Sequence, residues 1–61
     1  MDTIKEILMR RDGLRSWEAE EVISGARDKM LEFLQKGDLY SAENICKDEF
    51  GLEPDYIIEL L

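Results

Sequence analysis

The sequence contains no histidine and a single cysteine, Cys46. Histidine is the usual general acid or base near neutral pH, and a cysteine nucleophile normally needs a neighbouring base to activate it. We therefore expect neither an enzyme active site nor a bound cofactor, and we interpret Cys46 as a small residue of the core. Since one cysteine cannot form an internal disulfide, association with another chain is the remaining way to stabilise so short a domain.

Long apolar runs are also missing, as is a basic N-terminal stretch followed by an apolar core and a cleavage site. A membrane-spanning helix needs about 20 predominantly apolar residues, and a secretory signal needs the second pattern. An unpaired cysteine suits a reducing compartment. We expect a cytoplasmic protein that does not bind membranes.

Negative charge is concentrated in the second half of the chain. The 61 residues carry a net charge of −7, but residues 1–15 carry four cations against three carboxylates, whereas residues 38–61 carry one cation against seven. Nucleic acids and anionic membranes should repel a chain with this charge. Direct nucleic-acid binding is therefore not expected, although the two ends could attract each other within one molecule or between two.

Several carboxylates surround the turn expected at Gly51, namely Asp48, Glu49, Glu53 and Asp55. Carboxylates could hold Mg²⁺ or Ca²⁺ weakly, but a calcium loop needs oxygens at alternate positions around a central glycine. The spacing here does not match, so we favour a solvated acidic surface and expect no metal site.

The clearest pattern is an amphipathic helix over residues 16–36. Ser16 is a suitable cap for its first turn, and Gly37 is a suitable end. Its apolar positions recur at helical spacing and form one stripe: Ala19, Val22, Ile23, Ala26, Met30, Phe33 and Leu34. A helix of about 20 residues is roughly 30 Å long, so the rest of the chain must pack against it.

Three shorter helices are expected around the long one. Thr3 followed by Glu6 has the spacing of a capping box, Gly13 and Gly51 can adopt left-handed turns, Asp38 can cap a third helix, and Pro54 suits the first turn of a fourth. The pattern predicts an all-α compact bundle in a single domain, residues 1–61, with short helices over residues 3–12, 38–50 and 54–61.

Two apolar residues lie outside the main stripe. Trp17 and Leu31 are two heptads apart with Ser24 between them, so they form a sparse second line along the long helix. Either a neighbouring helix of the same chain covers them, or they face another copy. Tryptophan is enriched in interfaces, so we place Trp17, Leu31 and Tyr56 on a candidate protein interface.

A basic cluster at Arg10, Arg11 and Arg15 has two interpretations. Cations near the C-terminal end of a helix interact favourably with its dipole, which makes them ordinary solvated charges. Alternatively, they could bind the carboxylates of another chain through forked hydrogen bonds. We include them in the candidate interface.

Residues 42–61 have the spacing of a helix-turn-helix around Gly51. Against DNA reading, Lys47 stands where that motif usually has a small residue, and Glu53, Asp55 and Glu59 would place negative charge beside phosphates. A corner that serves only packing is the favoured interpretation. The alternative is a DNA-linked regulator, acting directly or as a mimic of DNA charge that binds a DNA-binding protein.

The segments IKEILMRRDGL and FGLEPDYIIELL, joined by a helix rich in Ala and Glu, resemble a type of short uncharacterised protein found in phage, prophage and environmental bacterial sequences. This type has no established activity, so the resemblance implies no site residues. It implies a small accessory protein that acts by binding another protein. Together with the residues, it favours a non-enzymatic, acidic interaction module or accessory regulator that forms a homodimer or higher homo-oligomer.

Overall fold

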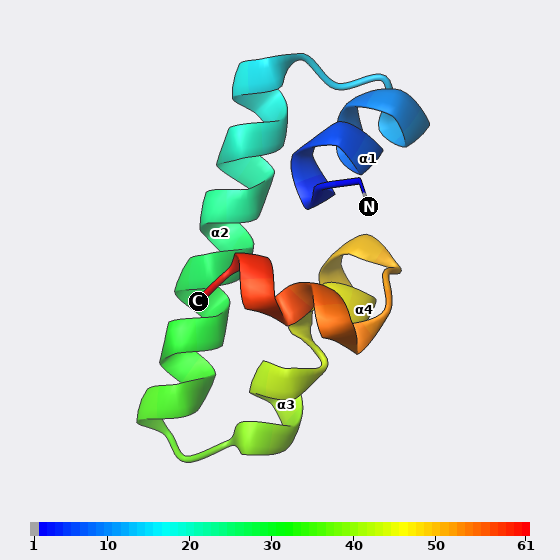
Figure 1. The fold of residues 1–61 in the computed structure, drawn as a ribbon. Helices are drawn as coiled ribbons and strands as arrows, with labels where there is room; N and C mark the ends of the chain where they lie inside the picture. The colour runs from blue at the N-terminus through cyan, green and yellow to red at the C-terminus, as the bar shows by residue number, and fades with distance from the viewer. Residues whose placement is uncertain (1) are drawn as a thin grey trace.

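The computed structural model describes residues 2–61, which fold into helices joined by tight turns (Figure 1). The helices are α1 (Ile4–Asp12), α2 (Ser16–Gln35), α3 (Leu39–Glu43), α4 (Ile45–Phe50) and the 3₁₀ helix η1 (Pro54–Glu59). No strand occurs within the described residues. Figure 1 shows α2 along one side of the molecule, with the shorter helices packed against it. The all-α prediction with one long helix is confirmed.

Thr3 caps the start of α1 and Gly13 ends it, as predicted, but the predicted capping box forms only in part, because the Glu6 carboxylate bonds the Thr3 hydroxyl and not its backbone N–H. The Thr3 hydroxyl accepts a hydrogen bond from the backbone N–H of Glu6 at 3.2 Å and donates one to the Glu6 carboxylate at 3.0 Å. Gly13 ends the helix with a φ of 68°, in the left-handed region that glycine tolerates best.

The long helix is one residue shorter at its end than predicted, and its first turn is capped differently. Ser16 is already helical, so the prediction of Ser16 as the cap is wrong. Instead, the Glu18 carboxylate reaches back and accepts a hydrogen bond from the Arg15 backbone N–H at 2.9 Å. At the other end, Gly37 has a φ of 76°, and the Asp38 N–H bonds the Phe33 carbonyl at 2.8 Å, which closes the last turn.

The predicted single helix over residues 38–50 is wrong, because the chain breaks at Asn44. This residue has φ −100° and ψ 11°, and its side-chain amide donates to the Tyr40 carbonyl at 2.8 Å. Asparagine side chains compete for backbone groups in this way and interrupt helices. The Asp38 cap is confirmed, since its carboxylate accepts from the Ser41 N–H at 3.1 Å.

The predicted last helix over residues 54–61 is a 3₁₀ helix instead of an α-helix. Both of its ends show the hydrogen bonds of a 3₁₀ helix, which join residues three positions apart. The Tyr56 N–H donates to the Glu53 backbone carbonyl, and the Leu60 N–H donates to the Ile57 backbone carbonyl. With three residues per turn, Ile57 and Leu60 lie on the same side, which is the side that faces the core.

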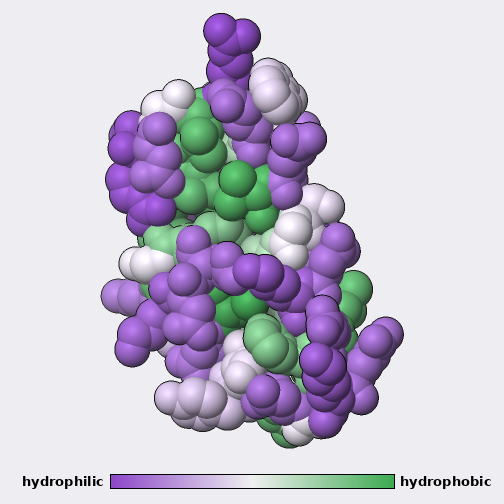
Figure 2. Space-filling model, turned by 180° about the vertical axis from the view of Figure 1, so that it is seen from behind, coloured by the Kyte–Doolittle hydropathy of each residue, from purple (hydrophilic) through white to green (hydrophobic). Residues whose placement is uncertain are grey.

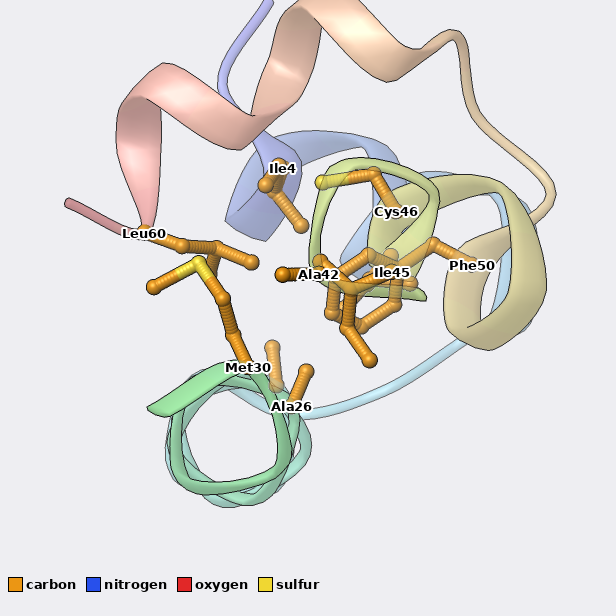
Figure 3. Close-up of a cluster of buried hydrophobic side chains, with 10 residues drawn as sticks. Ile4, Ala26, Met30, Ala42, Ile45, Cys46, Phe50 and Leu60 are labelled. Atoms are coloured by element: carbon orange, nitrogen blue, oxygen red, sulfur yellow. The ribbon is translucent and has the colours of Figure 1, made fainter. Parts of the chain in front are cut away.

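All of the helical segments contribute to one apolar cluster (Figure 3). Its buried members are Ile4, Leu8, Ala19, Ala26, Met30, Ala42, Ile45, Cys46, Phe50 and Leu60. The core position predicted for Cys46 is confirmed, and burial, with the nearby Glu59 carboxylate as a second cause, raises the pKa of its thiol. Val22 and Leu34, predicted for the core stripe, remain exposed because they lie at its edges, beyond the short helices that cover it.

Polar contacts hold the C-terminal segment on this core. The Glu59 carboxylate accepts a hydrogen bond from the Ile4 backbone N–H at 3.0 Å, and the Arg27 guanidinium donates to the Leu60 carbonyl at 3.2 Å. The first bond joins residues 55 positions apart and satisfies a donor at the start of α1. Across residues 2–61, no helix has the length and apolar character needed to cross a membrane.

Candidate interaction surfaces

Large apolar side chains remain exposed on several helices. They are Met9, Trp17, Val22, Leu31, Leu34, Leu39, Tyr40, Ile58 and Leu61. Single exposed apolar residues are normal on a soluble protein, whereas groups of them mark interaction sites. The spatial grouping of these residues therefore distinguishes candidate interaction surfaces from isolated exposed side chains.

The first group lies on the side of α2 that points away from the core. We define the outer face of α2 as Trp17, Ser24 and Leu31, which fall within an arc of about 40° at about 100° per residue. Trp17 is 57% exposed and Leu31 is 48% exposed, so the alternative that the chain itself covers them is wrong. Figure 1 shows that, among the described residues, the short helices gather on one side of α2.

The outer face extends along most of the helix. Trp17 and Leu31 lie 14 positions apart, which corresponds to about 21 Å at 1.5 Å per residue. Glu20, Glu21, Asp28 and Glu32 are exposed on the same helix and border the apolar line. The outer face therefore presents two separated apolar side chains within an acidic surround, and its tryptophan is the residue type that interfaces favour.

A second apolar area lies on the side of the molecule that is hidden in Figure 1. Figure 2 shows apolar side chains gathered in the upper half of that side, over α1 and the first part of α2, with hydrophilic side chains around them. These helices carry Met9 and Val22, which are 37% and 43% exposed. Both residues are less exposed than Trp17, so the outer face of α2 offers the larger individual contacts.

Two arginines of the predicted interface already have partners in their own chain. Arg10 pairs with Asp2 at 2.6 Å, and Arg11 pairs with Asp12 at 2.9 Å. Each ion pair lowers the pKa of the carboxyl group through the hydrogen bond and through the positive charge of the arginine. The third arginine, Arg15, is exposed in the link between α1 and α2.

Arg11 has a structural role that the sequence pattern did not indicate. Its guanidinium also donates to the Phe50 carbonyl at 2.6 Å, across 39 positions of sequence. Phe50 is the last residue of α4, where carbonyl groups lack helical partners. Arg11 therefore caps α4 from α1, and the cluster of arginines is partly structural.

Tyr56 differs from the other predicted interface residues. Its side chain is half-buried and packs against the apolar cluster, so the ring contributes to the core. Trp17 and Leu31 have no comparable inward contact and are the members of the predicted set that present the most apolar surface. The structure thus brings the six residues to different places: the outer face, the arginine cluster and the edge of the core.

A shallow groove beside η1 was not predicted. We define the η1 groove by its lining residues, which are Glu43, Pro54, Asp55, Ile57 and Ile58. It is open to solvent and brings the end of α3 next to η1, two elements that the break at Asn44 and the turn at Gly51 place together. Sequence periodicity carries no signal for it, because the groove depends on how two short helices meet.

The acidic residues do not converge on a cation site. Within residues 2–61, no group of three or more cysteine, aspartate or glutamate side chains is arranged to hold a metal ion. Comparisons with protein-family models, with curated proteins and with solved structures gave no match for this chain. The interaction surfaces are therefore identified by their chemistry alone.

Proposed function

We propose that this chain is a non-enzymatic, acidic interaction module whose outer α2 face pairs with a second copy. The observation that carries the proposal is the 57% exposure of Trp17 on the side of α2 that points away from the core. Tryptophan burial dominates many interfaces, and truncating such a residue often costs 2 kcal/mol or more of binding free energy.

The size of the chain supports pairing. A single core in a protein below about 70 residues rarely supplies more than about 3–5 kcal/mol, and oligomerisation is one of the usual supplements. The described residues have no disulfide, since Cys46 is free. A second copy would remove Trp17 and Leu31 from water on both chains at once, which is how a two-fold interface doubles each contact.

Sedimentation across a range of concentrations tests the proposal. We expect a mass of at least two chains at micromolar concentration. Trp17→Ala truncates a tryptophan on both chains, so we expect it to weaken the assembly by about 1,000-fold, the equivalent of about 4 kcal/mol. Helix content should stay the same, because Trp17 lies outside the core. A monomeric wild-type protein at all concentrations would refute self-association.

Matched variants locate the interface. Tyr40→Ala removes another exposed aromatic ring, 78% exposed on α3, and should leave the mass unchanged. Val22→Ser changes an exposed apolar residue on a different side of α2, and it should also have no effect. Dissociation by Val22→Ser but not by Trp17→Ala would overturn the assignment to the outer face.

Salt gives an independent check. Each chain carries a net charge of −7, so two copies repel each other and added salt should strengthen their association. An interface held by ion pairs between the basic first segment and the acidic second half would weaken with salt instead. That result would contradict an apolar interface on α2.

The DNA-reading alternative receives less support from the geometry. The helix that would enter the groove of DNA is η1, a 3₁₀ helix of 6 residues that carries Asp55 and Glu59. One of these carboxylates, Glu59, already bonds the start of α1. Absence of a gel shift with duplex DNA at low salt is the expected result, and a salt-sensitive shift would favour the alternative.

A further inference from the structure

The η1 groove has the shape of a docking site for part of another chain. It encloses about 420 Å³ but is largely open to solvent, which suits a protruding side chain better than an enclosed small ligand. Ile58 contributes exposed apolar surface at 71% exposure, and Ile57 forms the half-buried side next to the core.

The rim of the groove is negatively charged. Glu43 and Asp55 are exposed, and neither side chain forms a hydrogen bond or ion pair with another residue of the described chain. Residues 38–61 contain seven carboxylates and one cation, Lys47. Their combined field favours a cation in this groove over an anion.

The wall formed by η1 is held in place before any partner arrives. The Glu59 carboxylate bonds the Ile4 N–H at 3.0 Å, and the buried Leu60 accepts from Arg27 through its carbonyl at 3.2 Å. Ile58 lies between the start of η1 and these anchored residues. A fixed wall lowers the conformational entropy lost on binding.

We propose that the η1 groove binds a basic amphipathic segment of a different protein. A lysine or arginine of that segment meets the carboxylates of Glu43 and Asp55, and a neighbouring apolar side chain covers Ile58. The basic first helix of a second copy is a poorer occupant, because Arg10 and Arg11 already pair with carboxylates of their own chain. This proposal does not depend on self-association through α2.

The test uses a capped peptide of about 12 residues with lysine and leucine at helical spacing. Fluorescence anisotropy measures its affinity, and amide chemical shifts in the ¹⁵N-labelled protein locate its site. We expect the largest shifts at Glu43 and at residues 54–58, and weaker binding in higher salt because the Debye length falls to about 8 Å at 0.15 M. Peptides with glutamine for lysine, or with serine for leucine, should bind more weakly.

Charge variants separate this groove from the acidity of the whole chain. Glu43→Gln combined with Asp55→Asn should weaken binding by about tenfold, the equivalent of about 1.4 kcal/mol. Glu6→Gln combined with Asp48→Asn removes the same charge from exposed positions outside both the groove and the outer face of α2, and it should change affinity by less than about twofold at 0.15 M salt. Equal losses in both variants, or shifts confined to the outer face of α2, would overturn the proposal.

A second variant removes the apolar contact that Ile58 would make with the peptide. Ile58→Ser should weaken binding by about fivefold while helix content is unchanged, since this side chain lies in solvent in the free protein. The sedimentation mass of the groove variants should equal that of the wild type. Failure of the peptide to bind would refute the groove proposal and leave the pairing of α2 to be judged by its own mass measurement.

Discussion

The two sides of α2 differ in how much of their apolar surface is buried. The inner side buries Ala19, Ala26 and Met30, two of which are among the smallest residues available, whereas the outer side presents Trp17 and Leu31 to solvent. Small residues let the short helices approach α2 closely, and those helices supply bulky residues such as Ile45 and Phe50 (Figure 3). The chain therefore completes its core without Trp17, its largest exposed side chain.

The sharpest test of this comparison uses adjacent residues on the two sides. Met30→Ala should lower the free energy of unfolding by about 2–5 kcal/mol, because the side chain is 1% exposed and its loss leaves a cavity. That cost is comparable to the total stability expected at this size, so the variant should be largely unfolded. Denaturant unfolding followed by circular dichroism measures it.

Leu31→Ala, one position along the chain, is the matched control. Its side chain is 48% exposed, so we expect a loss below about 1 kcal/mol when the protein is dilute enough to be monomeric. A similar loss in both variants would show that the outer face supports the fold of the single chain.

Enlarging a side chain should destabilise the fold more on the inner side of α2 than on its outer side, although by less than the loss of Met30. Ala26→Leu forces extra atoms into a site that is 3% exposed, and we expect a loss of about 1–3 kcal/mol from overpacking. Ser24→Leu adds a similar side chain to the outer face and should leave the monomer within about 0.5 kcal/mol of wild type. Thermal melts of both variants compare the two sides directly.

Replacing Gly25, within α2, by alanine should stabilise the folded protein. An added Cβ at Gly25 meets no atom within 4 Å, and this position lies inside a regular helix. Gly25→Ala should therefore raise the free energy of unfolding by about 0.5–1 kcal/mol. Gly51→Ala should do the reverse, losing about 1–2 kcal/mol, because the residue has a φ of 68°.

The smallest expected effect is a pH dependence at the start of α3. Hydrogen bonds from Ser41 lower the pKa of Asp38 below its ordinary value of 3.8. This carboxylate therefore stabilises the folded state above pH 3.8, and the contribution is lost as pH falls through the lower folded pKa. Asp38→Asn keeps a capping oxygen that does not titrate, so its unfolding free energy should fall less between pH 5 and pH 2.5.

Local chemistry predicted much of the framework. The extent of α2, the turns at Gly13 and Gly37 and the cap at Asp38 depend on residues within a few positions of each other, so sequence spacing indicates them. The break at Asn44 could have been anticipated from the tendency of asparagine to bond nearby carbonyl groups. The strong apolar spacing on either side of Asn44 favoured one continuous helix instead.

The interaction surfaces were predicted less completely. Trp17 and Leu31 were identifiable because helical periodicity separates them from the buried stripe. The Arg11 contact with the Phe50 carbonyl spans 39 positions, and the η1 groove depends on two short helices meeting. No periodic pattern encodes such contacts, since they arise only after the chain has folded.

The bond between the Glu59 carboxylate and the Ile4 N–H can form only after the C-terminal segment has been synthesised. A ribosome adds about 5–20 residues each second, so residue 59 is joined roughly 3–11 s after residue 4. Until the C-terminal segment has been made, Met30 lacks its neighbour Leu60, and the first turn of α1 lacks one of its acceptors. The nascent chain therefore exposes part of its future core to water until Leu60 has left the exit tunnel of the ribosome.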